Sequence, residues 1–352
     1  MADELKLGLQ LGYWTAQPPD PKELIERARR AEALGFDSVW TGESWSSDAF
    51  TPLAWIAAHT DRLNLATGIA QMSARSPVTM AMHAMTLDSL SGGRFRLGIG
   101  VSGPQVVEGW YGRPFSKPLA RTREYVQIIR DVLAREAPVT NDGPHYPLPY
   151  RGPDAVGLGK PLKSITHPPR ADIPIYTAAV QKGMSRMAGD VADGLIGHII
   201  CSAQWIEQEI VPAFELGLSR SGRDRSSFTY LPSICVAIDD DYQRGLEAAR
   251  KTLAFYSTVK TYLPLYELHG FGQNAADAGA AFRKGDLAGV AAAIPDEMVE
   301  TYCAVGTPDK VREKVAEVAG FGDGILPGAP TYFIPNEQIV EYNERIIEVF
   351  GN

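Results

Sequence analysis

Residues 91–104 read SGGRFRLGIGVSGP, and the segment GIGVSG within them matches the G-x-G-x-x-G pattern of dinucleotide-binding folds. In those folds the pattern turns directly from a strand into a helix whose N-terminal amides bind a pyrophosphate. The strand half is present, because Arg94 to Ile99 alternate polar and apolar residues. Three prolines and two glycines then follow Gly103 before Leu119, a density that predicts a loop. We therefore expect a strand followed by a loop here, and not a Rossmann phosphate site; saturable binding of NAD would contradict this expectation.

Short strand-like runs alternate with amphipathic helical segments on both sides of this stretch. The expected strands are 6–12, 36–41, 62–68, 94–100, 173–179, 193–200, 228–238 and 330–334. The expected helices are 20–34, 77–90, 117–135, 182–192, 203–220, 240–258, one that opens at Thr307, and 336–350. Alternating strands and helices predict an α/β protein, either an open doubly wound sheet or a closed barrel. Eight strands in 352 residues favour a (β/α)8 TIM barrel with insertions.

Three stretches interrupt this alternation and are expected to be insertions. They are the Pro/Gly-rich loop 101–116, the segment 138–172 with its eight prolines, and the Ala/Gly-rich segment 259–305, which we expect to be partly helical. The insertions follow strands four and seven of the series. No linker composition separates two parts of the chain, so we expect residues 1–352 to form a single domain.

Composition limits the partners. The chain has 34 basic and 42 acidic residues, a formal charge of −8, which argues against a nucleic-acid or membrane surface. No apolar run approaches the ~18 residues needed to span a bilayer. The charged start MADELK lacks a signal-peptide core, and three cysteines without a C-x-x-C pair suggest reduced thiols. We expect a cytoplasmic protein that acts on a small molecule.

Functional residues of a parallel barrel collect where its strands end. That rule gathers residues 12–14, 42–45, 68–71, 101–103, 178–181 and His198. No nucleophile motif is present, and the six histidines lack metal-ligand spacing. We expect neither covalent catalysis nor a metal site.

Aromatic side chains are frequent at this predicted rim and suit a flat, largely apolar ligand. The candidates for a substrate pocket are Tyr13, Trp14, Trp45, Trp110 and His198. Any one of the aromatic residues is also explained by core packing. As a set at loop positions, they favour a binding site.

Glu43 is the strongest single candidate for a catalytic residue. It follows an apolar strand directly and lies between Trp40 and Trp45, so we expect it to be partly buried. Burial raises the pKa of a carboxyl group toward values that suit acid–base catalysis. Two alternatives are equally open: Glu43 caps a helix near residue 51, or it pairs with an arginine.

Four segments, taken in order, resemble the bacterial luciferase-like superfamily, and more narrowly its coenzyme F420-dependent oxidoreductase branch. They are GFDSVWTGESWSSDAFTPL, LATGIAQMSARSPVTMAMHAMTLDSLSGGRFRLGIGVSG, WYGRPFSKPLARTREYV and VGTPDKV. The resemblance covers most of the chain and is weakest at 138–172 and 259–305. It implies a TIM barrel, usually a homodimer, with a flavin or deazaflavin ring at the rim.

The resemblance also implies roles for particular residues. It places a non-prolyl cis peptide at Gly68–Ile69, behind the ring, and Glu43 at the ring's reactive edge. The loop that contacts the cofactor side chain is then Val101, Ser102 and Gly103. The loop that binds its phosphate is Ala178, Ala179, Val180 and Gln181. Ser44 stands where the sugar-phosphate branch has a histidine, so that substrate class is disfavoured.

The leading hypothesis is hydride transfer between the deazaflavin F420 and an unidentified small organic substrate, with Glu43 as proton donor or ring-edge ligand and Asp48 second. Four basic residues in 151–170 favour the acidic tail of F420, although a solvated loop explains them too. One alternative is an FMN-dependent monooxygenase. Another is a non-catalytic flavin-binding protein on the same fold.

Overall fold

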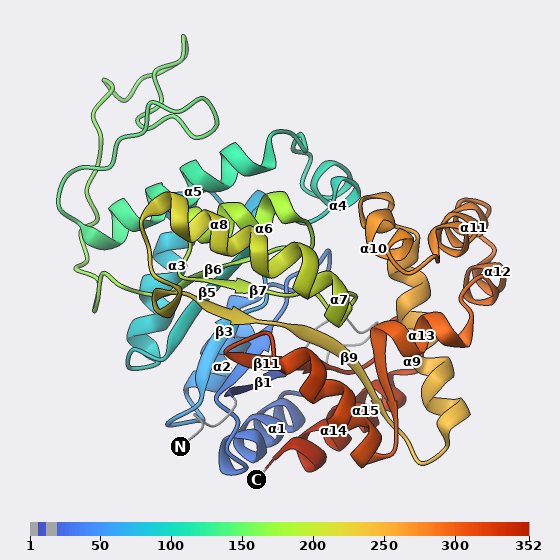
Figure 1. The fold of residues 1–352 in the computed structure, drawn as a ribbon. Coiled ribbons are helices and arrows are strands. Elements are labelled where there is room, and N and C mark those ends of the chain that lie inside the picture. Colours follow the sequence, from blue (N-terminus) through green and yellow to red (C-terminus); the bar gives the residue numbers. More distant parts are fainter. Residues whose placement is uncertain (1–5, 12–19, 352) are drawn as a thin grey trace.

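One parallel sheet, whose strands alternate with helices, forms the centre of the structure (Figure 1). The structure is a computed structural model that describes residues 6–11 and 20–351. Its strands are β1 (Lys6–Gln10), β2 (Ser38–Thr41), β3 (Asn64–Thr67), β4 (Ala70–Gln71), β5 (Phe95–Gly100), β6 (Ile175–Ala178), β7 (Gly194–Ile196), β8 (Thr229–Leu231), β9 (Ser233–Ile238), β10 (Cys303–Gly306) and β11 (Gly324–Gly328). Its α-helices are α1 (Pro21–Ala33), α2 (Phe50–Ala57), α3 (Pro77–Leu90), α4 (Pro104–Gly109), α5 (Pro118–Ala134), α6 (Lys182–Val191), α7 (Ala203–Trp205), α8 (Val211–Ser221), α9 (Tyr242–Ser257), α10 (Leu263–Glu267), α11 (Gly272–Arg283), α12 (Leu287–Ala292), α13 (Asp296–Tyr302), α14 (Pro308–Ala319) and α15 (Asn336–Phe350).

The sheet is curled. Strands β1, β2, β3, β5, β6, β7 and β8 lie side by side in chain order, while β11 pairs with both β1 and β9. Only Pro232 separates β8 from β9, so one stretch of chain pairs with β7 through its first part and with β11 through its second. The backbone of β11 and the residue before it bonds to both parts: Asp323 N–H to Tyr230 O at 2.8 Å, and Leu326 N–H to Pro232 O at 2.9 Å. A doubly wound sheet reverses its strand order at a switch point, and this sheet has none among these neighbours.

Side chains fill the inside of the curl. Trp40 lies there with five other buried residues, and its indole meets the ring of Tyr176 edge-on with centroids 5.9 Å apart. Gly8 leaves the necessary room, because a Cβ at this position would lie 2.6 Å from Trp40 Nε1. A filled interior means that a ligand binds at the strand ends and not through the middle.

The glycines of GIGVSG serve strand packing. A Cβ on Gly98 would overlap the carbonyl oxygen of Thr67, whose hydroxyl donates to Gly98 O at 2.7 Å and accepts from Gly98 N–H at 2.9 Å. A Cβ on Gly100 would lie 2.8 Å from Ile69 Cδ1. The first two glycines of the motif therefore allow close approach of neighbouring strand backbones and side chains.

The expectation of a helix-free loop after Gly103 was wrong. The helix α4 begins at Pro104, where the missing N–H costs nothing because the first helical amides have no partner, and it buries Val107. It ends at Gly109 after six residues, and the Gly- and Pro-rich stretch follows only then. The strand order still excludes the Rossmann interpretation.

The eighth strand is at 324–328 and not at 330–334 as expected. Between Pro330 and Pro335 the chain is irregular, and the amides of Thr331 and Tyr332 donate to the hydroxyl of Thr252 on α9 instead of to a strand. The apolar residues of this segment face other aromatic side chains. The apolar residues of 330–334 suggested a strand in the sequence, but in the structure they pack in a side-chain cluster.

The true strand β11, GILPG, carries two glycines and a proline and so looks unlike a strand. Its pairing with β1 uses Gly324 and Ile325, before the proline. Pro327 therefore interrupts no bond of that ladder. All five residues are buried between β1 and β9, which decides the conformation against the local preference.

Helix boundaries agree well with the sequence where a cap marks them. Asp20 Oδ1 accepts from Lys22 N–H at 2.8 Å at the start of α1. Ser76 caps α3, which has the predicted bounds 77–90. The helix α15 has the predicted bounds 336–350 without a capping side chain, so apolar periodicity also marks helix boundaries.

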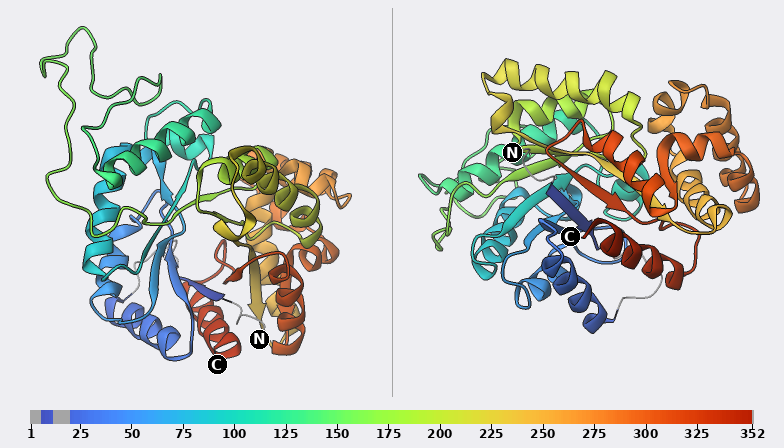
Figure 2. Two further views of the ribbon diagram at one scale, coloured as in Figure 1. Left: turned by 60° about the vertical axis from the view of Figure 1, so that its left-hand side comes forward. Right: turned by 60° about the horizontal axis from the view of Figure 1, so that its bottom comes forward.

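Two of the three predicted insertions differ strongly in form. Residues 138–172 contain no helix and no named strand, and both views in Figure 2 show them projecting from the body as an arm. The segment 259–305 holds α10 to α13 and the first part of β10, and its helices gather at one side of Figure 1. The expectation that this segment is partly helical is confirmed.

Candidate functional site

The residues at the carboxyl ends of β2 and β3 form a tight unit. The peptide bond Gly68–Ile69, between β3 and β4, is cis, as the resemblance implied. Ile69 O accepts from Glu43 N–H at 3.0 Å, and Gly68 N–H donates to Thr41 O at 2.8 Å. A Cβ on Gly68 would lie 3.2 Å from Trp40, so the indole backs this turn directly. The cis bond is therefore tied to the segment that carries Glu43.

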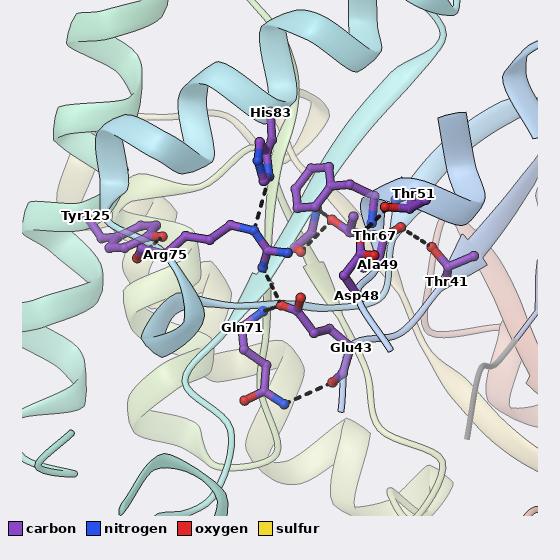
Figure 3. A network of polar contacts seen from close by, with 12 residues as sticks. Thr41, Glu43, Asp48, Ala49, Thr51, Thr67, Gln71, Arg75, His83 and Tyr125 are labelled. Atoms are coloured by element: carbon purple, nitrogen blue, oxygen red, sulfur yellow. Dashed lines mark hydrogen bonds and ion pairs between the residues drawn. The ribbon is translucent and has the colours of Figure 1, made fainter. Parts of the chain in front are cut away.

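Glu43 is buried, with 4% of its surface exposed, and one oxygen of its carboxylate, Oε2, accepts two hydrogen bonds (Figure 3). Oε2 accepts from Gln71 N–H at 2.7 Å and from Arg75 Nη1 at 2.7 Å. The amide Nε2 of Gln71 in turn donates to Glu43 O at 2.9 Å. Of the two alternatives left open by the sequence, pairing with an arginine is the one found.

Arg75 is the residue of this site that sequence reasoning missed. Its Nε donates to His83 Nδ1 at 3.1 Å, its guanidinium lies 5.0 Å from the ring centre of Phe50, and Tyr125 donates to its carbonyl at 3.0 Å. Burial and then the charge of Arg75 lower the pKa of His83, which matches its role as an acceptor. A lone arginine just before a Ser-Pro helix start was the available signal, but nothing in the sequence linked it to Glu43.

Asp48 accepts hydrogen bonds from backbone amides at the start of α2. Its Oδ1 accepts from the amides of Phe50 and Thr51, both at 2.8 Å. Burial alone would raise the pKa of this carboxyl, but hydrogen bonds from Thr51 and Phe50 and the charge of Arg75 outweigh it and lower the pKa. The capping role that one alternative gave to Glu43 belongs to Asp48.

The aromatic candidates at the rim are spread around it. Trp45 and Trp110 are 45% and 61% exposed. Tyr111 is half-buried, and burial and then the charge of Glu43 raise its pKa, so its hydroxyl lies near the Glu43–Arg75 pair. Tyr13 and Trp14 lie outside the described residues.

His198, which follows β7, lies in an aromatic cluster that also contains Phe255, Tyr256, Tyr262, Tyr332 and Phe333. Its ring meets Tyr256 edge-on with centroids 4.7 Å apart and lies 5.5 Å from Tyr262. Burial among these rings lowers the pKa of His198 to about 4, so it is neutral at physiological pH. Tyr332, from the segment mistaken for a strand, contributes to the same cluster by packing on Tyr256.

The loop after β5 holds an unusual backbone at Ser102 and not at Gly103. Ser102 has φ +59°, whereas Gly103 is extended and directly precedes α4. A Cβ on Gly103 would meet only Gln105 Oε1, at 3.5 Å. The backbone conformation therefore does not require glycine at 103. Val101 lines a small cavity beside Met72, next to the cis turn.

The loop after β6, residues 178–181, leads into α6 without a capping side chain. Gln181 turns its amide away from the helix, and Nε2 donates to Thr261 O at 2.6 Å. Trp205 Nε1 donates to Val180 O at 2.9 Å, which fixes the loop from the other side. The first amides of α6 are thus left without a side-chain acceptor.

Three of the four basic residues of 151–170 contact acidic or carbonyl groups of the protein itself. Arg170 pairs with the fully buried Asp88 at 2.9 Å, and Lys163 donates to Glu136 O at 2.9 Å. Arg151 lies 3.8 Å from Asp142. These contacts remove the sequence argument that this stretch binds an acidic cofactor tail.

Two absences hold for residues 6–11 and 20–351. No group of three or more His, Cys, Asp or Glu side chains is arranged to hold a metal ion. No helix is both long and apolar enough to cross a membrane.

Comparison with known proteins identifies the family. The family model for luciferase-like monooxygenases matches residues 7–323. A Mycobacterium tuberculosis protein named as a coenzyme F420-dependent oxidoreductase is 44% identical over 332 residues, covering 90% of this chain and 93% of its own. The 5,10-methylenetetrahydromethanopterin reductase of Archaeoglobus fulgidus is 31% identical and covers 89% of this chain and 91% of its own. The solved coenzyme F420-dependent tetrahydromethanopterin reductase of Methanopyrus kandleri shares the fold, with a TM-score of 0.80, 22% identity and 98% coverage of both chains. The chain belongs to the luciferase-like monooxygenase family.

Proposed function

We propose that this protein transfers a hydride between the deazaflavin coenzyme F420 and a small organic substrate. The observation that carries the proposal is the buried Glu43 at the ends of β2 and β3, whose carboxylate is held by Arg75 and the Gln71 amide and whose N–H donates to Ile69 O. A fixed backbone surface beside a buried ion pair suits a planar redox ring. The 44% identity to the mycobacterial relative supports F420 as the cofactor.

The proposed scaffold is a closed (β/α)8 barrel in one domain. In this view β8 and β9 form one strand that is kinked at Pro232, and β10 lies outside the ring. The hydrogen bonds of Tyr230 and Pro232 to the chain at 323–326 support closure. The insertions 101–116 and 138–172 then follow the fourth strand, and 259–305 follows the seventh.

The rim residues fit such a cofactor. We assign its binding to Glu43, Gly68, Ile69, Val101, Ser102, Gly103, Ala178, Ala179, Val180 and Gln181. The side chain of Gln181 donates to the carbonyl of Thr261 and does not cap α6. The first amides of α6 are therefore free to bind a phosphate. When bound, the deazaflavin supplies a carbon centre that gives or takes a hydride, with its electrons moving as a pair.

Glu43 is the proposed catalytic residue that contacts the ring edge, and its pair with Arg75 defines what it does. An oxygen held by a guanidinium and a backbone amide is fixed in place, so Glu43 orients the ring edge and sets its local charge. Asp48 is a weaker candidate than the sequence indicated, since a carboxyl with a lowered pKa donates no proton near neutrality.

The proposed substrate space lies between this charged side and the aromatic side around His198. The exposed indoles of Trp45 and Trp110 contribute its outer edge. A neutral His198 among tyrosine rings favours a small uncharged or weakly polar molecule over a phosphorylated one. Ser44, in place of a histidine, agrees with this.

Titration of the apoprotein with F420 and, separately, with FMN tests the cofactor assignment. We expect saturable quenching or enhancement of F420 fluorescence with a dissociation constant well below that of FMN. Tight FMN binding with no response to F420 would overturn the cofactor assignment and favour the second candidate, the FMN-dependent monooxygenase, which agrees with the description of the family model.

A non-catalytic flavin-binding role predicts a different result for Glu43→Gln. For an enzyme, this variant keeps cofactor binding but loses turnover of any substrate found by screening alcohols, ketones and imines with F420. For a storage protein, no substrate is turned over by either form.

We also propose a homodimer. The outer sides of α2 and α3 expose Trp55, Met82 and Leu90, at 49%, 56% and 64%. Apolar side chains of this size on neighbouring helices suit an isologous contact. Light scattering coupled to gel filtration tests this; Met82→Glu is expected to produce monomers, whereas a monomeric wild type would contradict the proposal.

A further inference from the structure

Gln71, the last residue of β4, holds a buried amide oxygen that has no hydrogen-bond partner within the described part of the chain. The residue is 3% exposed. A buried acceptor without a donor is costly and is rare in native proteins. Something outside these residues is expected to supply the donor.

The orientation of this amide is fixed by its neighbours. Nε2 donates to Glu43 O at 2.9 Å, and the backbone N–H of Gln71 donates to Glu43 Oε2 at 2.7 Å. A flipped amide would place two oxygens against each other, because a carbonyl only accepts. Figure 3 shows the Oε1 atom pointing away from Glu43, on the far side of the amide.

The position of Gln71 directs this oxygen to the rim. Successive residues of a strand point to opposite faces, and Ala70 belongs to the main hydrophobic core and not to the cluster inside the curl, so Gln71 lies on the face that turns inside the curl. Gln71 pairs in register with Gly100, the last residue of β5 and the one before Val101. The acceptor therefore sits directly above the inner cluster, beside the cis turn and the loop assigned to the cofactor.

We propose that Gln71 Oε1 accepts a hydrogen bond from a ring N–H on the pyrimidinedione edge of the bound deazaflavin and so fixes how the ring lies in the site. The inference rests on the proposed function. Phosphate and carboxylate groups of a cofactor tail carry no proton to donate at neutral pH, whereas the pyrimidinedione edge does. Gln71 is a positioning and recognition residue in this role, and Glu43 keeps its own contact.

Three variants separate the acceptor from the bond to Glu43. Gln71→Met removes both the acceptor and the donor at similar volume. Gln71→Glu keeps an oxygen in place but loses the donor to Glu43 O. Gln127→Met makes the same chemical change on the exposed side of α5, where the amide donates to Asp131, and serves as the control.

Each purified protein is titrated with F420, and fluorescence gives the dissociation constant. A sample with ¹⁵N-labelled F420 is examined by NMR, in which a ring N–H protected by a hydrogen bond shows its one-bond splitting. We expect wild type, Gln127→Met and Gln71→Glu to show the splitting. Gln71→Met is expected to lose it and to bind about tenfold more weakly.

Two results overturn the inference in different ways. If Gln71→Met binds F420 as wild type does and keeps the splitting, the oxygen serves another donor, such as a substrate hydroxyl, and the proposed function stands. If wild type binds no F420, the inference falls together with the proposed function. Equal losses in Gln71→Met and Gln71→Glu would show that the bond to Glu43 matters and the acceptor does not. Should Gln71→Met fail to fold, the chemical shift of the ring N–H decides: a carboxylate acceptor in Gln71→Glu moves it from its wild-type position if the two groups are in contact, and an unchanged shift overturns the inference.

Discussion

Oε2 of Glu43 and Nη1 of Arg75 lie 2.7 Å apart, although 32 positions separate the two residues in the chain. Their side chains are only 4% and 12% exposed. The pair joins the end of β2 to the loop before α3 and encloses the cis turn between them. Its removal is therefore expected to affect stability as well as the rim.

Arg75→Met should destabilise the fold by about 3–5 kcal/mol, because it leaves a buried carboxylate without its partner. The double variant Glu43→Gln/Arg75→Met should recover most of that loss, since no buried charge remains. Urea unfolding of wild type, both single variants and the double variant measures the coupling. Strictly additive losses would show that the two charges do not interact.

Gly98→Ala should prevent folding or lower the unfolding free energy by several kcal/mol. The added Cβ would overlap the carbonyl oxygen of Thr67, a backbone atom that cannot move without shifting β3. Gly109→Ala is the matched control, because nothing lies within 4 Å of its Cβ position at the exposed end of α4. Thermal melts of both variants suffice, and equal melting temperatures would contradict the prediction.

Gly217→Ala should lower stability by about 1–3 kcal/mol through the contact between α6 and α8. A Cβ at 217 would overlap the backbone oxygen of Arg186 on the facing helix. Gly183→Ala, at the start of α6, meets only Leu119 at 3.9 Å and should be neutral or slightly stabilising. Denaturant midpoints compare the two; a neutral result for Gly217→Ala would mean that the helices separate easily.

Stability should fall as the pH drops from 6.5 to about 4, in part through His198. Its pKa in the folded protein is about 4, against 6.5 as the ordinary value, so the unfolded chain binds the proton first and acid favours unfolding. The contribution is fully present above pH 6.5 and amounts to roughly 3 kcal/mol at its limit. Urea midpoints at pH 7 and pH 5 measure it, and His198→Phe should show a smaller difference than wild type. An unchanged difference would mean that His198 remains hydrated.

Local signals in the sequence predicted much of the fold. Helical periodicity predicted α1 and α3 close to their observed bounds, and alternation marked most strands, because both signals depend on neighbouring residues. Strand β11 was missed because its residues, including Pro327, are kept extended by burial between two strands and not by their own preferences. The aromatic segment around Tyr332 was misread since alternating apolar residues also suit a side-chain cluster.

The sequence predicted individual residues of the candidate site, but it did not predict which of them contact one another. The position of Glu43 after a strand predicted its burial correctly. Its partner could not be identified, because the sequence gives no distance between residues 43 and 75. The same limit concealed Gln71, whose importance lies in a missing partner that only three-dimensional placement reveals.

Strand β10 returns the chain from α10 to α13 and pairs in register with the outer part of β9, from Cys303 with Cys235 to Gly306 with Ile238. This excursion, the segment 259–305, is therefore held by its own strand pairing, β10 with β9. This pairing is separate from the pairings among the strands that form the curl. A change in the length of this excursion leaves the pairings of β2, β3, β4 and β5, which hold Glu43 and the cis turn, as they are. The molecule therefore consists of a constant curl and an added helical unit that is attached at one strand edge.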